Sequence, residues 1–233
     1  MSFDLIIQAR FNSSRLRGKV FLNIGENMNS LDMLVKTAKK IRKIRKIILA
    51  VPNDKFSNIF KDFANKKKIY YFKSKKISEF DVLKRFFFAS KYFDSKNIIR
   101  ITSDCPFINS KIIELMIKKF IEENLEFLTN NKPRFVPHGF DCEIFSQKML
   151  KQIYYNAKKK YQKEHVTAWF YDNLFNQNNN YTLFKKNFSK LRLTLDTAED
   201  YISFVLNFKK YYEISQSTNP EVSIKKLYEK RKK

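Results

Sequence analysis

Residues 6–21 of this chain read IIQARFNSSRLRGKVF, and they join the end of an apolar run to a strongly basic segment. After Leu5–Ile7 come three arginines, one lysine, two serines and one of the chain's three glycines, with no acidic residue among them. Serine hydroxyls and free backbone N–H groups hold phosphate oxygens, while arginine and lysine balance their charge. The pattern therefore predicts a buried strand followed by a phosphate-binding loop.

This loop is of neither common nucleotide-binding type. In a Walker A motif a glycine would replace Ser13, and serine or threonine would replace Val20 after Lys19. No Gly-x-Gly-x-x-Gly fingerprint occurs in the chain either. A solvated basic loop is the alternative interpretation. Glycine is scarce in this chain, and Gly18 lies in this loop while Gly139 lies in a second candidate segment. Their positions favour the interpretation as a phosphate-binding loop.

Outside the loop, apolar runs rich in β-formers alternate with segments of helical periodicity. Strands separated by helices predict βαβ units, and hence an α/β fold with a mostly parallel sheet covered on both faces. With 233 residues and no linker, we expect one domain, 1–233, whose segment 220–233 is a peripheral helix that frays at its end. The predicted strands are Phe3–Gln8, Lys46–Val51, Ile69–Phe72, Asn97–Thr102, Glu126–Thr129, Phe140–Phe145, Tyr181–Phe184 and Leu191–Leu195. The predicted helices are Leu31–Ile44, Glu79–Phe93, Lys111–Glu123, Gln147–Lys158, His165–Asn173 and Ala198–Phe208. Expected helix N-caps are Ser78 with Asp81, and Ser146.

Composition narrows the class of protein. The net charge of +24 and pI near 9.9 suit a nucleic-acid-binding protein, but the excess of lysine accompanies abundant Asn, Ile, Phe and Tyr, which is typical of a compositional bias. We therefore expect no specific nucleic-acid partner. Cys105 and Cys142 are too few for a disulfide framework, and with only two histidines a zinc site has little to build on. Without a signal-peptide pattern or an apolar run of membrane-spanning length, we expect a cytoplasmic protein that is not inserted in a membrane.

Two aspartates come after predicted strands. Asp104 succeeds Asn97–Thr102 and Asp196 succeeds Leu191–Leu195, so both are expected at the edge of the sheet where ligands of α/β proteins gather. Two carboxylates from separate strands can hold Mg²⁺ against phosphate oxygens. For each aspartate alone, capping the next helix is the alternative, above all for Asp196.

The sequence also resembles a known family. QARFNSSRLRGKVF is similar to the signature Q-A-R-x-x-S-T-R-L-P-G-K-V of cytidylyltransferases related to CMP-sugar synthetases, in the branch named after spore-coat polysaccharide biosynthesis. Further segments resemble that branch in the same order along the chain: SEFDVLKRFFFA (78–89), RITSDCPFIN (100–109), PHGFDCEIF (137–145), KEHVT (163–167) and LRLTLDTAED (191–200).

The resemblance implies a Rossmann-like nucleotidyltransferase that uses CTP and Mg²⁺, transfers CMP to a sugar acid or related anionic acceptor, and releases pyrophosphate, in the synthesis of surface polysaccharide. It implies a catalytic role for Arg10, Lys19 and Asp104, and metal binding by Asp104 and Asp196. The implied nucleotide-binding residues are Gln8, Ala9, Arg10, Ser13, Ser14, Arg15, Lys19, Ser78, Asp81 and Ser103. The implied acceptor-binding residues are His138, Asp141, Glu143, Glu164 and His165.

Some residues depart from the family pattern. Asn12 replaces a frequent glycine, Arg17 a proline, and His138 an acidic residue, where a cation would suit an anionic acceptor such as a sugar acid or sugar phosphate. Glu164 and His165 are as consistent with a structural role as with acceptor binding. Asp141 and Glu143, which alternate along a predicted strand and so share one face, bind acceptor hydroxyls or face solvent. Both cysteines are expected to be packed thiols.

Other classes remain open. A nucleotidyltransferase for a different NTP would share these motifs, while a nucleotide-sugar glycosyltransferase would be expected to carry Asp-x-Asp where this chain has TSDCP. A nucleic-acid-binding protein would need lysines, arginines and aromatics on one face. The sequence identifies neither the acceptor nor the oligomeric state, a homodimer included.

Overall fold

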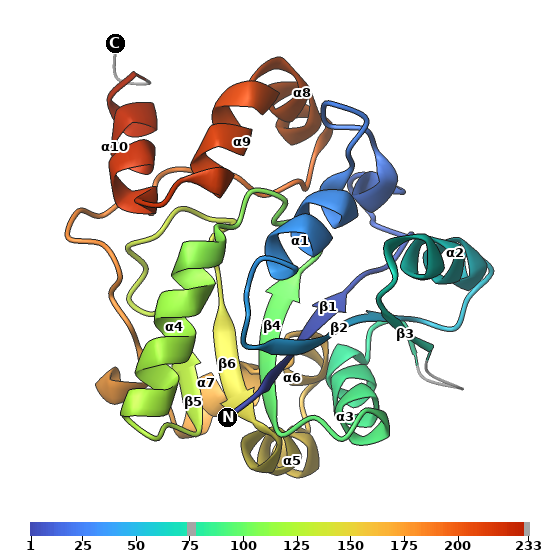
Figure 1. Ribbon diagram of the computed structural model, residues 1–233. Helices are drawn as coiled ribbons and strands as arrows, with labels where there is room; N and C mark the ends of the chain where they lie inside the picture. Colours follow the sequence, from blue (N-terminus) through green and yellow to red (C-terminus); the bar gives the residue numbers. More distant parts are fainter. Residues whose placement is uncertain (74–77, 231–233) are drawn as a thin grey trace.

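The computed structural model describes residues 1–73 and 78–230, and a six-stranded sheet forms its centre (Figure 1). The strand order is β3-β2-β1-β4-β6-β5. β1, β2, β3 and β4 pair in parallel, whereas β6 runs antiparallel to both of its neighbours. The predicted α/β fold with a mostly parallel sheet is confirmed. The strands are β1 (Phe3–Gln8), β2 (Ile44–Val51), β3 (Tyr70–Lys73), β4 (Asn97–Thr102), β5 (Phe127–Thr129) and β6 (Glu143–Ser146).

Helices cover both faces of this sheet because its strands carry apolar side chains on both sides. Leu5 and Ile7 of β1 belong to one buried cluster, which packs against α1 (Ser30–Ala38), α2 (Ser57–Lys67) and α4 (Ser110–Glu122). Ile6 lies in the cluster on the opposite face. That cluster packs against α3 (Val82–Tyr92), α5 (Gln147–Asn156) and α7 (Ala168–Asn173). α6 (Lys160–Glu164) lies against α3.

The C-terminal helices form a third layer, which lies beyond the carboxyl end of β4 (Figure 1). They are α8 (Ala198–Leu206), α9 (Phe208–Gln216) and α10 (Pro220–Lys230). Their apolar side chains share a core with Phe107, Phe140 and the leucines of segment 191–195. Within residues 1–73 and 78–230, no helix has both the length and the apolar character needed to cross a membrane.

The predictions of strands at Tyr181–Phe184 and Leu191–Leu195 were wrong. Leu191, Leu193 and Leu195 are buried alternately as in a strand, but their backbone N–H and C=O groups pair with the loop around His138 and with the Asp104 carbonyl instead of with a sheet edge. Near 181 the chain touches β5 through a single bridge, Thr129 to Asn180. Alternating burial therefore arises here from packing under α8 and α9.

Several element boundaries also differ from the predictions. α2, α6 and α9 were not predicted, and the helix expected over Leu31–Ile44 ends at Ala38 because β2 already begins at Ile44. The helix expected from His165 starts at Ala168, since Val166 adopts a left-handed conformation (φ 46°). The helix expected in segment 220–233 is present as α10, but residues 231–233, where fraying was expected, lie outside the described residues.

Candidate active site

A cleft of about 300 Å³ lies at the carboxyl ends of β1 and β4. β1 leads into the basic loop predicted from the sequence, β4 leads into the turn that carries Asp104, and α3 and α6 complete the wall. The cleft is lined by Gln8, Ala9, Arg10, Ser13, Ser14, Arg15, Lys19, Val82, Arg85, Arg100, Thr102, Ser103, Asp104, Glu164, His165 and Asp196.

The basic loop is shaped so that Lys19 faces this cleft. Gly18 has a φ of 69°, which favours glycine, and a Cβ there would come within 3.0 Å of the Phe11 ring. The Gly18 N–H donates to the Phe11 carbonyl (2.8 Å), and the Phe11 ring stacks on Phe56 with 4.1 Å between centroids. Arg17, which stands where relatives have proline, lies over these two rings rather than in the cleft.

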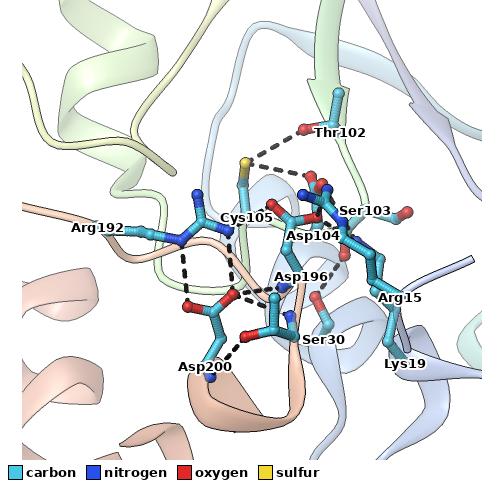
Figure 2. Close-up of polar contacts among 11 residues, drawn as sticks. Arg15, Lys19, Ser30, Thr102, Ser103, Asp104, Cys105, Arg192, Asp196 and Asp200 are labelled. Carbon is cyan, nitrogen blue, oxygen red and sulfur yellow. Dashed lines mark hydrogen bonds and ion pairs between the residues drawn. The ribbon is translucent and has the colours of Figure 1, made fainter. Parts of the chain in front are cut away.

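The Lys19 ammonium contacts both of the aspartates identified from the sequence, Asp104 and Asp196 (Figure 2). Its ammonium donates to Asp196 Oδ1 at 2.8 Å and lies 3.4 Å from Asp104 Oδ2. The Lys19 side chain is only 11% exposed, so this contact is largely shielded from water. Both aspartates thus lie at the ligand-binding edge of the sheet where the sequence predicted them.

Neither aspartate caps a helix. Thr197 caps α8 and forms a capping box with Asp200, while Asn109 caps α4. The turn bearing Asp104 is instead held by Ser30 at the start of α1, whose hydroxyl donates to the Ser103 carbonyl (Figure 2). The capping alternative is therefore excluded for both residues.

Asp196 is surrounded by cations. Arg15 lies 2.9 Å from its Oδ1 and Arg192 lies 2.7 Å from its Oδ2, in addition to Lys19 (Figure 2). Burial opposes ionisation of this carboxyl, but the hydrogen bond and charge of Lys19, helped by the two arginines, hold its pKa below the ordinary value. Asp196 is thus a carboxylate at neutral pH.

The two aspartates suit a metal ion that arrives with a phosphate ligand. Mg²⁺ is usually bound by one or two carboxylates together with substrate phosphates, and it keeps several waters. No group of three or more His, Cys, Asp or Glu side chains in the described ranges could form an all-protein metal site. Asp104 and Asp196 therefore fit Mg²⁺ as it is held in a nucleotide site, with the phosphates supplying the other ligands.

Most residues predicted to bind the nucleotide line the cleft. Ser78 and Asp81 do not: Asp81 caps α3 by accepting from the Lys84 N–H (3.0 Å), and Ser78 accepts from the Phe80 N–H (3.3 Å). Asp81 at α3 and Ser146 at α5 are N-caps as predicted from the sequence, but the prediction of Ser78 as a cap was wrong, because α3 begins only at Val82. The predicted nucleotide-binding residues in the cleft wall are Gln8, Ala9, Arg10, Ser13, Ser14, Arg15, Lys19 and Ser103.

The residues predicted to bind the acceptor separate into two groups. Glu164 and His165, at the end of α6, line the cleft. Asp141 and His138 do not; Asp141 precedes β6 instead of lying in it, and it pairs with Arg134 at 2.6 Å. The idea that Asp141 and Glu143 share a face of one strand was therefore wrong. The chain is irregular before β6 because Gly139, at φ 98°, packs its Cα against the Leu193 carbonyl.

His138 does not supply the cation expected near the acceptor. Desolvation and the positive charges of Arg134 and Arg192 lower the pKa of this histidine below its ordinary value of 6.5, against the attraction of Asp141. The imidazole is consequently neutral at neutral pH, and the expectation of a cation at this position was wrong.

Glu143, the remaining residue predicted to bind the acceptor, does not line the cleft but is buried behind its wall. It is buried, sits opposite Arg100 in the β4–β6 pairing, and accepts from Arg100 Nη1 at 2.6 Å. Its second oxygen accepts from Thr167 (2.9 Å) and Tyr171 (2.7 Å). Burial and this carboxylate raise the pKa of Tyr171, which stays a hydroxyl donor. Glu143 thus fixes Arg100, whose side chain reaches the cleft.

Four residues of the cleft wall were not predicted from the sequence: Val82, Arg85, Arg100 and Thr102. Both arginines lie inside segments that resemble the family, SEFDVLKRFFFA and RITSDCPFIN, which was the available signal. Cys105 and Cys142 are buried, and burial raises the pKa of both thiols, in agreement with the prediction of packed, unreactive cysteines.

Comparison with known proteins assigns the family. The sequence profile of the family described as Cytidylyltransferase matches residues 5–232. The chain belongs to this cytidylyltransferase family. As a member, it is a nucleotidyltransferase, and the resemblance noted from the sequence is confirmed.

Individual relatives agree with this assignment. The chain is 33% identical to the uncharacterized protein MJ1063 of Methanocaldococcus jannaschii over 90% of this chain and 84% of that protein. It is 28% identical to the spore coat polysaccharide biosynthesis protein SpsF of Bacillus subtilis, over 95% of this chain and 90% of SpsF. A solved cytidylyltransferase from Leptospira borgpetersenii superposes with a TM-score of 0.85 and 27% identity, covering 100% of this chain and 95% of that one.

Proposed function

We propose that this cytidylyltransferase transfers CMP from CTP to a sugar that bears a carboxylate or phosphate group, with Mg²⁺ and with release of pyrophosphate, in the synthesis of a surface polysaccharide. The observation that carries the proposal is the junction of Lys19 with Asp104 and Asp196 beneath the basic loop. The likeness to SpsF, a spore coat polysaccharide biosynthesis protein, supports the polysaccharide role.

The charge pattern of the junction explains how a nucleotide would enter. Lys19 and Arg15 both contact the Asp196 carboxylate in the structure. Asp104 and Asp196 would hold Mg²⁺, which would supply positive charge that polarises the phosphate oxygens. Lys19 and Arg15 could then turn their N–H groups to the triphosphate, which needs cations in the same place.

Catalysis would rest on positioning and charge. The cleft needs no covalent nucleophile, since an acceptor hydroxyl can attack the α-phosphorus in line with the departing pyrophosphate. Arg10, Lys19 and the loop serines Ser13 and Ser14 line the same cleft and would stabilise the charge that develops on the leaving group. Glu164 and His165 line the cleft on the α6 side and would orient the acceptor hydroxyl.

The experiment incubates the protein with CTP, Mg²⁺ and a panel of sugar acids and sugar phosphates, and measures pyrophosphate. We expect release that requires CTP, Mg²⁺ and one class of anionic acceptor together. Release from another NTP in preference to CTP would reassign the base. Transfer of a sugar from a nucleotide-sugar, with no pyrophosphate, would replace the proposal by a glycosyltransferase.

A further inference from the structure

Arg85 is a buried cation in the wall of the cleft. It lies one turn into α3, between apolar residues of the face that packs on the sheet, and it is 1% exposed. Sequence periodicity places this position with the core residues Val82 and Phe86. Removing a guanidinium from water costs several kcal/mol unless partners offset the loss, so its presence here needs an explanation.

The partners present do not satisfy this guanidinium. Its Nη2 donates to the Glu79 carbonyl at 2.8 Å, whereas its Nε is buried and has no hydrogen-bond partner among the described residues. The carboxylates of Glu79, Asp54 and Asp81 attract Arg85 from a distance, but within the described part of the chain none of them forms an ion pair with it. The charge of Arg85 is therefore incompletely paired inside the protein, which is costly unless an anion bound in the cleft that Arg85 lines compensates it.

A second cation near Arg85 increases the need for an anionic partner. Arg10, which lies two residues beyond the end of β1, is near enough for its charge to oppose that of Arg85. Its guanidinium lies over the Phe80 ring, 5.6 Å from the centroid, and it too forms no ion pair among residues 1–73 and 78–230. Burial and the Arg10 charge lower the pKa of Arg85 to about 10, so the Arg85 guanidinium remains charged at neutral pH.

The other cations of the cleft are already paired. Lys19 and Arg15 contact Asp196, and Arg100 contacts Glu143. Arg10 and Arg85 are thus the arginines of the described cleft wall that form no ion pair. An anionic group bound in the cleft beside them would accept hydrogen bonds from the guanidinium groups and offset their mutual repulsion.

We propose that Arg10 and Arg85 form an anion subsite of the cleft, which binds a phosphate or carboxylate group of a substrate. Two groups share this chemistry: the polyphosphate of the nucleotide and the acid group of the acceptor. This inference rests on the proposed function for the identity of those substrates, but the subsite itself requires only that the cleft bind an anion.

The test measures binding without turnover. Wild type, Arg85→Gln and Arg85→Lys are titrated calorimetrically with inorganic pyrophosphate, with CTP, and with glucuronate and glucose 1-phosphate as acceptor-like acids. Lys91→Gln is the matched control, because it removes an exposed positive charge from the same helix, away from the cleft.

We expect Arg85→Gln to weaken binding of at least one anion by roughly ten- to a hundredfold, the effect of one charge-assisted hydrogen bond, with Arg85→Lys in between and Lys91→Gln like wild type. Loss for pyrophosphate and CTP assigns the subsite to the nucleotide, and loss for a sugar acid or sugar phosphate alone assigns it to the acceptor. Equal affinities for all four ligands in wild type and Arg85→Gln would overturn the proposal.

Thermal unfolding separates this role from a structural one. A purely structural arginine predicts a lower melting temperature for Arg85→Gln with unchanged anion affinity, which would also overturn the proposal. If Arg85→Gln does not fold, Arg10→Gln answers the question, since Arg10 is partly exposed and should show the same loss of anion binding. Failure of wild type to bind CTP while it still binds pyrophosphate would instead refute the proposed function and leave the subsite standing.

Discussion

Replacing Lys19 by methionine removes one charge and little volume. It therefore tests how much the contacts of Lys19 with Asp104 and Asp196 contribute to stability. The ammonium donates to Asp196 at 2.8 Å, and its second contact, to Asp104 at 3.4 Å, is longer and weaker. A hydrogen bond between charged groups contributes about 1.5–3 kcal/mol. Asp196 keeps Arg15 and Arg192, so we expect Lys19→Met to lower the free energy of unfolding by about 2 kcal/mol at neutral pH, in the lower half of that range.

The pH dependence of that loss identifies its cause. The pKa of Asp196 is depressed in the folded protein below 3.8, so its ion pairs stabilise the fold above that pH and lose their effect as pH falls through the folded pKa. The difference in stability between wild type and Lys19→Met should therefore shrink as pH drops below 3.8.

Urea unfolding at a series of pH values, monitored by circular dichroism, measures this difference. A difference that stays constant from neutral pH to well below 3.8 would refute the reasoning, because it would trace the loss to packing of the lysine stem. In the transferase assay the same variant should lose roughly tenfold or more in turnover or CTP affinity.

Three further outcomes are expected. Gly139→Ala should lower the free energy of unfolding by at least about 1–3 kcal/mol in urea titrations, because a Cβ would lie 2.3 Å from the Leu193 carbonyl oxygen at a φ of 98°; wild-type stability would contradict the observed close approach. Glu143→Ala should cost about 3 kcal/mol in the same assay, since it strands the Arg100 charge, and Glu143→Gln should cost less; equal losses would argue against the ion pair. With Mg²⁺ present, CTP should raise the melting temperature more than ATP, GTP or UTP. A larger shift with another NTP would mean that the protein prefers that nucleotide to CTP.

The parts of the site that lie at strand ends were predictable from the sequence. β1 and β4 are short runs with mostly apolar centres, and the residues at the carboxyl ends of neighbouring parallel strands lie along one edge of the sheet. Lys19 and Asp104 are placed correctly on these grounds. Asp196 is too, although the segment before it is not a strand, because its leucines still bring the chain back to the Asp104 turn through the bond from Leu195 N–H to the Asp104 carbonyl.

Contacts made across the fold could not be predicted from the sequence. Arg85 occurs with helical periodicity in an apolar face, where a charged residue is not expected, and only the structure reveals that this face borders the cleft. His138 has an ordinary side chain whose proton affinity depends on Arg134 and Arg192, both brought close by folding. α2 escaped prediction because few of its residues are buried, chiefly Phe60, Phe63 and Ala64.

The most direct test of the metal-dependent transferase mechanism compares pyrophosphate release by wild type, Asp104→Asn and Asp196→Asn at saturating CTP and acceptor, as Mg²⁺ is titrated. Asparagine keeps the shape of the side chain but not the charge that a hard cation requires. We predict Mg²⁺-dependent release by wild type and none by either folded variant. If both variants released pyrophosphate at the wild-type rate and with the same Mg²⁺ dependence, the two carboxylates would not be the metal site of this enzyme.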